Sequence, residues 1–131
     1  VQLDAEQSAW VERYFRDTLQ PLLSPILLES GRLFPSVFDG HIYLAIKIRE
    51  KDKIRYGMVD IPTDSLSRFV QIPHRKGSKG KVFIVLDNII RHCLHELFRG
   101  VIKVQHAEAY TFKITLDAEL EIVRLRRFSG E

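Results

Sequence analysis

Cysteine is almost absent from this chain of 131 residues: Cys93 is its one thiol, so no disulfide can form within it. No apolar run approaches the roughly 18 residues that a membrane span needs, and the first residues lack the basic-then-apolar pattern of a secretory signal. An excess of one charge is lacking too, because 20 basic and 17 acidic residues leave a net charge of +3. A surface that follows nucleic acid normally clusters more cations than this. We therefore expect a cytoplasmic protein with neither a transmembrane segment nor a nucleic-acid partner.

The residues that are present describe an ordinary globular domain. Hydrophobic residues make up 45% of the chain and charged residues 28%, which is the balance of a folded protein rather than a disordered one. A chain of this length can bury one core without disulfides or metals. The sequence contains no internal repeat and no linker-like stretch, so we expect residues 1–131 to form a single domain.

The start of the chain has the pattern of an amphipathic helix. Asp4 and Gln7 match a capping box, in which the shorter side chain accepts from a free backbone N–H and the longer one reaches back. The apolar face of the predicted helix consists of Trp10, Val11, Tyr14, Phe15, Thr18 and Leu19. Pro21 should end this helix, and residues 22–38, which mix prolines and a glycine with apolar residues, should be irregular.

Apolar residues at every second position predict several strands. The expected strands are residues 42–49, 54–61, 68–72, 81–85, 101–105, 110–116 and 120–125. The first two should form a hairpin with a charged turn, and the next two a hairpin with a glycine-containing loop over residues 73–80. Connections this short join antiparallel neighbours, because parallel strands need long crossovers.

A buried helix is predicted over residues 86–98. Its apolar stripe consists of Leu86, Ile89, Ile90, Cys93, Leu94, Leu97 and Phe98. Asp87 should face the positive end of the helix dipole, and Gly100 stands where a C-terminal cap belongs. The whole pattern predicts an α+β fold, a two-layer sandwich of a mainly antiparallel sheet with helices packed against it.

Cations gather in the second hairpin loop, at Arg75, Lys76, Lys79 and Lys81, beside two glycines and His74. We call residues 75–81 the basic loop. Its backbone donors and cations could attract phosphate. It is not a nucleotide P-loop, because no Ser or Thr follows Lys81 to bind magnesium and a strand rather than a helix comes next. Two interpretations stay open: a solvated hairpin tip, which we favour, and non-specific contact with a polyanion.

His92 and His95 lie three residues apart on the predicted helix, with Cys93 between them. Zinc-binding histidines on a helix more often lie four apart with a glutamate partner, so we favour surface histidines and predict no metal site. The other histidines are His41, His74 and His106. They stand at strand ends or in loops without a recognisable base, acid or nucleophile, so we assign no catalytic residue.

Two further groups have a structural and a functional interpretation. Trp10, Tyr14 and Phe15 form an aromatic face that we assign to the core, with an interface to a second copy or a neighbouring domain as the alternative. A short acidic run consists of Asp117, Glu119 and Glu121. Because apolar residues alternate with them, we favour the wet face of a strand over paired catalytic carboxylates.

Several pieces of the chain carry a resemblance to a known family. They are Glu6 and Gln7 with Trp10, Tyr14 and Phe15, then residues 21–25, 33–35, 68–70, 86–100 and 112–120. In this order and spacing they resemble the middle, or head, domain of the bacterial polyphosphate kinases that autophosphorylate on histidine. The resemblance covers nearly all of the chain, and it is the combination of pieces that is specific.

The resemblance implies a function for a longer protein. Such a kinase reversibly transfers the terminal phosphate of ATP to polyphosphate and uses ATP and Mg²⁺. In the family, the phosphorylated histidine, the nucleotide-binding arginines and the magnesium site belong to the C-terminal domains, and an adenine contact to the N-terminal domain. No position here matches those motifs, so no catalytic, cofactor-binding or metal-binding residue is carried over. The segment would be inactive alone, would organise a homodimer or higher homo-oligomer, and would contact the other domains of its chain.

One departure from the family concerns the junction of Ile122 and Val123. The family has a long acidic helical segment at this place, before a strand that begins with a Val-Arg-Leu-like sequence, whereas here the two strands adjoin directly. We expect the chain to be a piece of a longer one, with residues missing at this junction, either deleted or omitted. An intact mass well above 15.3 kDa would support omission, and agreement with 15.3 kDa would rule it out. The competing hypothesis is a free-standing module that binds an acidic partner or a polyanion through the basic loop.

Overall fold

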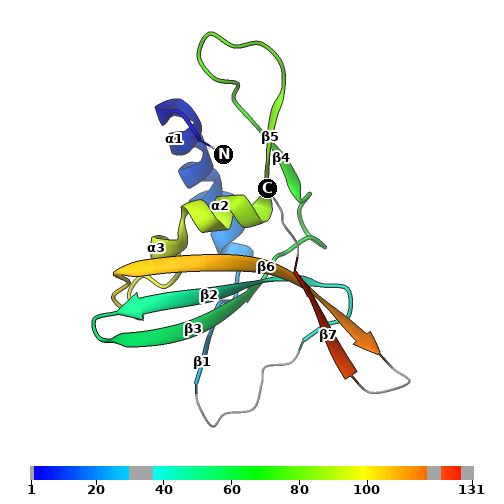
Figure 1. The fold of residues 1–131 in the computed structure, drawn as a ribbon. Coiled ribbons are helices and arrows are strands. Elements are labelled where there is room, and N and C mark those ends of the chain that lie inside the picture. The colour runs from blue at the N-terminus through cyan, green and yellow to red at the C-terminus, as the bar shows by residue number, and fades with distance from the viewer. Residues whose placement is uncertain (1, 30–36, 118–121, 128–131) are drawn as a thin grey trace.

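The computed structural model contains a five-stranded antiparallel sheet with helices on one side of it (Figure 1). It describes residues 2–29, 37–117 and 122–127. The large sheet has the order β1-β3-β2-β6-β7, and β4 and β5 form a separate hairpin. The strands are β1 (Ile26–Leu28), β2 (Ile42–Glu50), β3 (Lys53–Asp60), β4 (Phe69–Ile72), β5 (Val82–Val85), β6 (His106–Asp117) and β7 (Ile122–Arg127). Every pairing between described strands is antiparallel, which confirms the predicted α+β fold.

The first helix, α1 (Ala5–Tyr14), begins with the predicted capping box. The N–H of Gln7 donates to Asp4 Oδ1 at 2.8 Å, and the N–H of Asp4 donates to Gln7 Oε1 at 3.1 Å. Helical backbone then continues through the π-helical turn η1 (Phe15–Leu19) and the 3₁₀ turn η2 (Gln20–Leu22). Pro21 therefore lies inside a helical turn, and the prediction that it ends the helix was wrong. Proline is tolerated in a first turn, where its missing N–H would have no partner.

The predicted helix over residues 86–98 is two helices, α2 (Leu86–His92) and α3 (Leu94–Leu97). Cys93 separates them with φ −113° and ψ 24°, and its N–H is shared between the carbonyls of Ile89 and Ile90. The predicted apolar stripe is nevertheless buried along its whole length. Gly100 follows with φ +84°, a conformation that glycine adopts without strain. Within the described residues, each helix is too short or too polar to cross a membrane.

The main core lies between the large sheet and the helices. Leu44, Ile46 and Ile48 point from β2 toward the helices and are at most 1% exposed, in one cluster with Phe15. Burial of each such side chain stabilises the fold by about 1.5–3 kcal/mol. On β3, Gly57 lies opposite Ile46, and a Cβ added there would come within 2.8 Å of Phe98 Cζ.

The opposite face of the sheet carries a smaller buried cluster of Tyr43, Met58 and Ile114. In the described part of the chain, helices cover the first face only, so the layers are the predicted two (Figure 1).

Two strand predictions need correction. Residues 101–105, all of them described, form a turn and an irregular segment instead of a strand. The N–H of Gln105 donates to Arg49 O at 2.9 Å, and β6 begins at the next residue. In the stretch predicted to be irregular, β1 pairs with β3 at the edge of the sheet, while residues 30–36 lie outside the described part. The junction of Ile122 and Val123 falls within β7, and omission of residues there stays a prediction.

Candidate functional site

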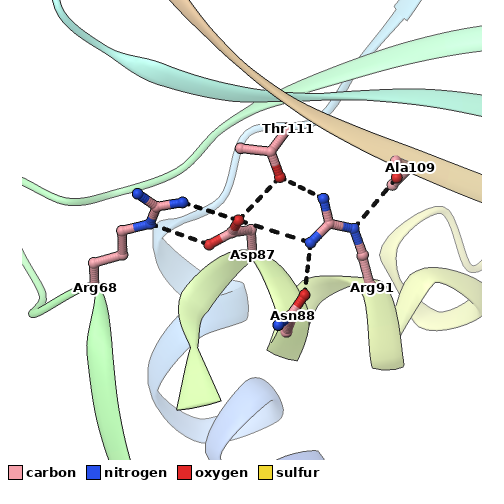
Figure 2. Close-up of polar contacts among 6 residues, drawn as sticks. All are labelled: Arg68, Asp87, Asn88, Arg91, Ala109 and Thr111. Atoms are coloured by element: carbon pink, nitrogen blue, oxygen red, sulfur yellow. Dashed lines mark hydrogen bonds and ion pairs between the residues drawn. The ribbon is translucent and has the colours of Figure 1, made fainter. Parts of the chain in front are cut away.

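The most deeply buried charge in the described part of the chain is Asp87, in the first turn of α2, whose side chain is 0% exposed (Figure 2). Arg68, which directly precedes β4, binds Asp87 in a bidentate contact. Its Nε donates to Asp87 Oδ1 at 3.3 Å, and its Nη2 donates to Oδ2 at 3.1 Å. A two-pronged contact of this kind fixes orientation as well as charge.

A second arginine, Arg91, reaches Asp87 from one helical turn further along α2. Its Nη1 lies 3.7 Å from Asp87 Oδ2 and donates to Asn88 Oδ1 at 2.6 Å. Its Nε donates to the carbonyl of Ala109 at 3.3 Å, and its Nη2 donates to the hydroxyl of Thr111. That hydroxyl donates in turn to Asp87 Oδ2 at 2.9 Å. The carboxylate thus receives hydrogen bonds or ion pairs from three different elements (Figure 2).

This network, which we call the Asp87 network, joins the two sheets. Arg68 belongs to the β4–β5 hairpin, Asp87 to α2, and Thr111 to β6 of the large sheet. A buried charge is stable only when its oxygens are paired, and both oxygens of Asp87 are. The arrangement therefore positions elements relative to one another. The helix dipole alone does not account for Asp87. The signal in the sequence is a carboxylate within an apolar stripe, four residues before an arginine.

The basic loop lies at the tip of the β4–β5 hairpin and is exposed throughout. Two contacts with the start of α1 hold it: Gln7 Nε2 donates to the carbonyl of Pro73 at 2.8 Å, and the N–H of Lys76 lies 3.4 Å from Asp4 Oδ2. The N–H of Gln7 is the largest cause that lowers the pKa of Asp4, with smaller contributions from the Lys76 N–H and the charge of Arg75. The two segments, whose contacts span 66 and 72 residues of sequence, thus lie side by side (Figure 1).

The helical histidines make separate contacts. His92 Nε2 lies 3.0 Å from Ser8 Oγ and 3.9 Å from Glu12 Oε1, so it links α2 to α1. His95 is exposed. Cys93 is buried, and this burial together with the nearby charge of Glu96 raises the pKa of the Cys93 thiol to about 12.

The remaining histidines also have local partners. His41 Nδ1 lies 2.8 Å from Asp60 Oδ2 and its Nε2 lies 3.5 Å from Asp64 Oδ2. His74 Nδ1 lies 3.1 Å from the carbonyl of Arg75, and His106 opens β6 opposite Arg49. Among the described residues, no three His, Cys, Asp or Glu side chains converge in a way that could hold a metal ion.

The aromatic face formed by α1 and the start of η1 divides between the two interpretations. Phe15 is fully buried, as the core assignment predicted. Trp10 and Tyr14 are half-buried and stack on each other, with ring centroids 5.3 Å apart and planes 10° from parallel. They pack against the core and keep an accessible edge. In the acidic run, Asp117 ends β6, and Glu119 and Glu121 lie outside the described residues.

Comparison with protein families decides what this domain is. The family model for the polyphosphate kinase middle domain matches residues 6–126. The chain belongs to that family. The predicted resemblance is thereby confirmed, and the matched span includes the Asp87 network and the basic loop.

Individual polyphosphate kinases agree with this assignment. The chain is 39% identical over 122 residues to the polyphosphate kinase of Vibrio parahaemolyticus and 37% identical over 123 residues to that of Escherichia coli K12. The crystal structure of polyphosphate kinase from Porphyromonas gingivalis superposes on 93% of the chain with a TM-score of 0.77 at 29% identity. The alignments cover 92% and 93% of the chain but 18% of each bacterial relative, and 19% of the crystallised chain.

Proposed function

We propose that this middle domain works within a polyphosphate kinase, an enzyme that reversibly transfers the terminal phosphate of ATP to a growing polyphosphate chain. ATP and Mg²⁺ are bound and phosphoryl transfer occurs in other domains of the full-length cytoplasmic enzyme. The domain itself is structural, and it organises contacts within the chain and between copies. The observation that carries the proposal is the similarity to polyphosphate kinases over 92% of this chain.

The use of the buried charges supports the structural role. The contacts of Asp87 with Arg68, Arg91 and Thr111 join the hairpin, α2 and the large sheet. These contacts give the domain a fixed internal geometry. A rigid core is what a domain needs to hold neighbouring catalytic domains in register.

Phosphate transfer is tested on the full-length parent, with this segment alone alongside it. Each is incubated with labelled ATP and Mg²⁺, and label is followed into acid-insoluble polymer and onto protein histidine. We expect polymer and phosphohistidine from the parent and neither from the segment. Polymer made by the segment alone would contradict the structural role, and a parent that makes none would contradict the kinase assignment.

The accessible edges of Trp10 and Tyr14 suggest where the domain meets another copy. Trp10→Arg in the full-length parent should shift its sedimentation from an oligomer toward a monomer, because a charge would enter an apolar contact. Ala9→Arg, on an exposed position of the same helix, is the matched control and should leave sedimentation unchanged. Equal sedimentation of the two variants would show that α1 does not form part of the interface between copies.

A second candidate function is a binding module for an acidic partner, favoured by the exposed cations of the basic loop. The charge reversals Arg75→Glu, Lys76→Glu and Lys79→Glu separate the two functions. A pure scaffold should fold and associate as before, whereas an anion-binding module should lose affinity together with its salt dependence.

A further inference from the structure

We propose that the basic loop is a docking site for the polyphosphate chain itself, outside the domains that carry out phosphoryl transfer. This inference rests on the proposed kinase function. Its starting point is the charge distribution: residues 65–86 contain no carboxylate side chain, and the basic loop carries four cations. Because the net charge of the chain is +3, everything outside those four cations is net negative by one charge.

The cations of the loop make no close ion pair with the described part of the fold, and only the charge of Arg75 is felt at Asp4. Arg75, Lys76, Lys79 and Lys81 are all exposed, and among the described residues none of them forms an ion pair within 4.0 Å. Other arginines of the described part do pair, as Arg68 does with Asp87. Uncompensated like charges in one loop repel each other, so an external polyanion would find them available.

The loop is also open to an approaching chain. Gly77 and Gly80 adopt φ of +85° and +100°, and a Cβ added at either position would meet no atom within 4 Å. The glycines are therefore needed for the backbone turn and leave space around it. An extended phosphate chain could therefore approach the side-chain cations without meeting bulky neighbours at the two glycines.

The stem beneath the loop is fixed at both of its ends. Arg68 ties the base of the hairpin to Asp87, and the contact of Gln7 with Pro73 ties the upper end to α1. The loop consequently stands out from the body at a set position (Figure 1). A site that is held in place before binding loses less conformational entropy when the ligand arrives.

Polyphosphate fits this surface better than single-stranded nucleic acid does. Proteins that bind single strands combine cations with aromatic platforms on which bases stack. Residues 74–81 contain cations and no aromatic side chain other than the imidazole of His74. Exposed phenylalanines, Phe69 and Phe83, lie lower on the hairpin strands, and they would be the platform if nucleic acid were the ligand.

The test measures direct binding of long-chain polyphosphate to the full-length parent at several salt concentrations. The variant carries Arg75→Gln, Lys76→Gln and Lys79→Gln, and the matched control carries Lys51→Gln, Lys53→Gln and Lys103→Gln near the turn between β2 and β3. Each neutralised charge contributes about 0.7 to the slope of log affinity against log salt, so the loop variant should lose about 2 from that slope. The affinity advantage of the wild type should then shrink about 20-fold between 50 and 200 mM salt.

Enzyme kinetics in the direction of ADP phosphorylation supply the second readout. The loop variant should have a raised KM for long-chain polyphosphate, with an unchanged kcat and an unchanged KM for ADP. Tripolyphosphate, which has too few phosphates to contact the loop cations and the reacting groups at once, should show no change. The control variant should match the wild type in every parameter.

Three results would each overturn the inference. The first is the same salt slope of polyphosphate binding in the loop and control variants, and the second is an equal rise of KM for tripolyphosphate and for the long chain. The third is binding of oligo(dT) that is tighter than that of polyphosphate and is weakened by Phe83→Ser. Failure of the proposed function is a distinct result, a wild-type parent that makes no polymer. Direct polyphosphate binding still decides the role of the loop in that case.

Discussion

Removing the buried carboxylate should destabilise this domain strongly. Asp87→Ala leaves Arg68 and Arg91 facing a site that was closed around a carboxylate, and it removes the acceptor of the Thr111 hydroxyl. Loss of one partner from a buried ion pair typically costs about 3–5 kcal/mol. The two arginine side chains are 24% and 27% exposed, so water can partly reach them. We therefore expect the lower end of that range, about 3 kcal/mol.

Asp87→Asn is the matched variant, because it keeps the shape and removes the charge. Its Oδ1 can still accept from Arg68 or Thr111, but charge-assisted hydrogen bonds are about twice as strong as neutral ones. The expected loss is about 1–2 kcal/mol, between wild type and Asp87→Ala.

Urea unfolding of the 131-residue chain, followed by circular dichroism, measures both variants. Addition of Arg68→Met to Asp87→Ala should cost much less than the sum of the two single changes, because both remove the same interaction. If Asp87→Ala costs less than about 1 kcal/mol, the ionic contacts add nothing beyond a surface pair, and the reasoning is refuted.

Three smaller predictions concern the core, the thiol and the helix cap. Gly57→Ala should destabilise the chain by about 1–3 kcal/mol in the same urea assay, because its Cβ would lie 2.8 Å from Phe98 Cζ and 3.2 Å from Ile26 O; adding Phe98→Leu should restore part of the loss. Cys93 should react slowly with iodoacetamide at pH 8 in the folded chain and quickly in urea, since burial raises the pKa of its thiol from 9.0 to about 12. The proton is therefore held more tightly in the folded state, so this stabilisation is complete below pH 9 and is lost as pH rises toward 12; equal labelling in both states would contradict the burial. Asp4→Ala should lower the Tm, and an unchanged Tm would show that the cap contributes little. Because the pKa of Asp4 is lowered in the folded state, its contribution to the stability of the wild type should be lost as pH falls below 3.8.

Local patterns in the sequence predicted the elements whose stability is local. The capping box at Asp4 and Gln7 is present because both partners lie within one helical turn. The alternation around Ile46 identified β2 and its neighbour β3, since a half-buried strand repeats every second residue. The apolar stripe that includes Ile90 identified the buried face of α2 in the same way.

Features that depend on distant partners could not be predicted. Three residues of β1 form a strand because β3 offers a free edge, and a run that short has no period of its own. The Asp87 network needs Arg68 and Thr111, which lie 19 and 24 residues away in sequence. The sequence around Cys93 also contains no glycine or proline that would predict the break between α2 and α3.

The contrast between two sets of cations in one hairpin argues that the basic loop is kept for a ligand. At the base, Arg68 is paired with a fully buried carboxylate, and that pairing fixes the hairpin on the body. At the tip, the cations form no ion pair within 4.0 Å among the described residues, although the charge of Arg75 is felt at Asp4, and their mutual repulsion works against the compact loop. A structural role alone would require the pairing of Arg68 at the base, and it would not require a cluster of cations at the tip. The structure therefore separates a part that holds the hairpin in position from a part that is presented by it, as a docking site for a polyanion requires.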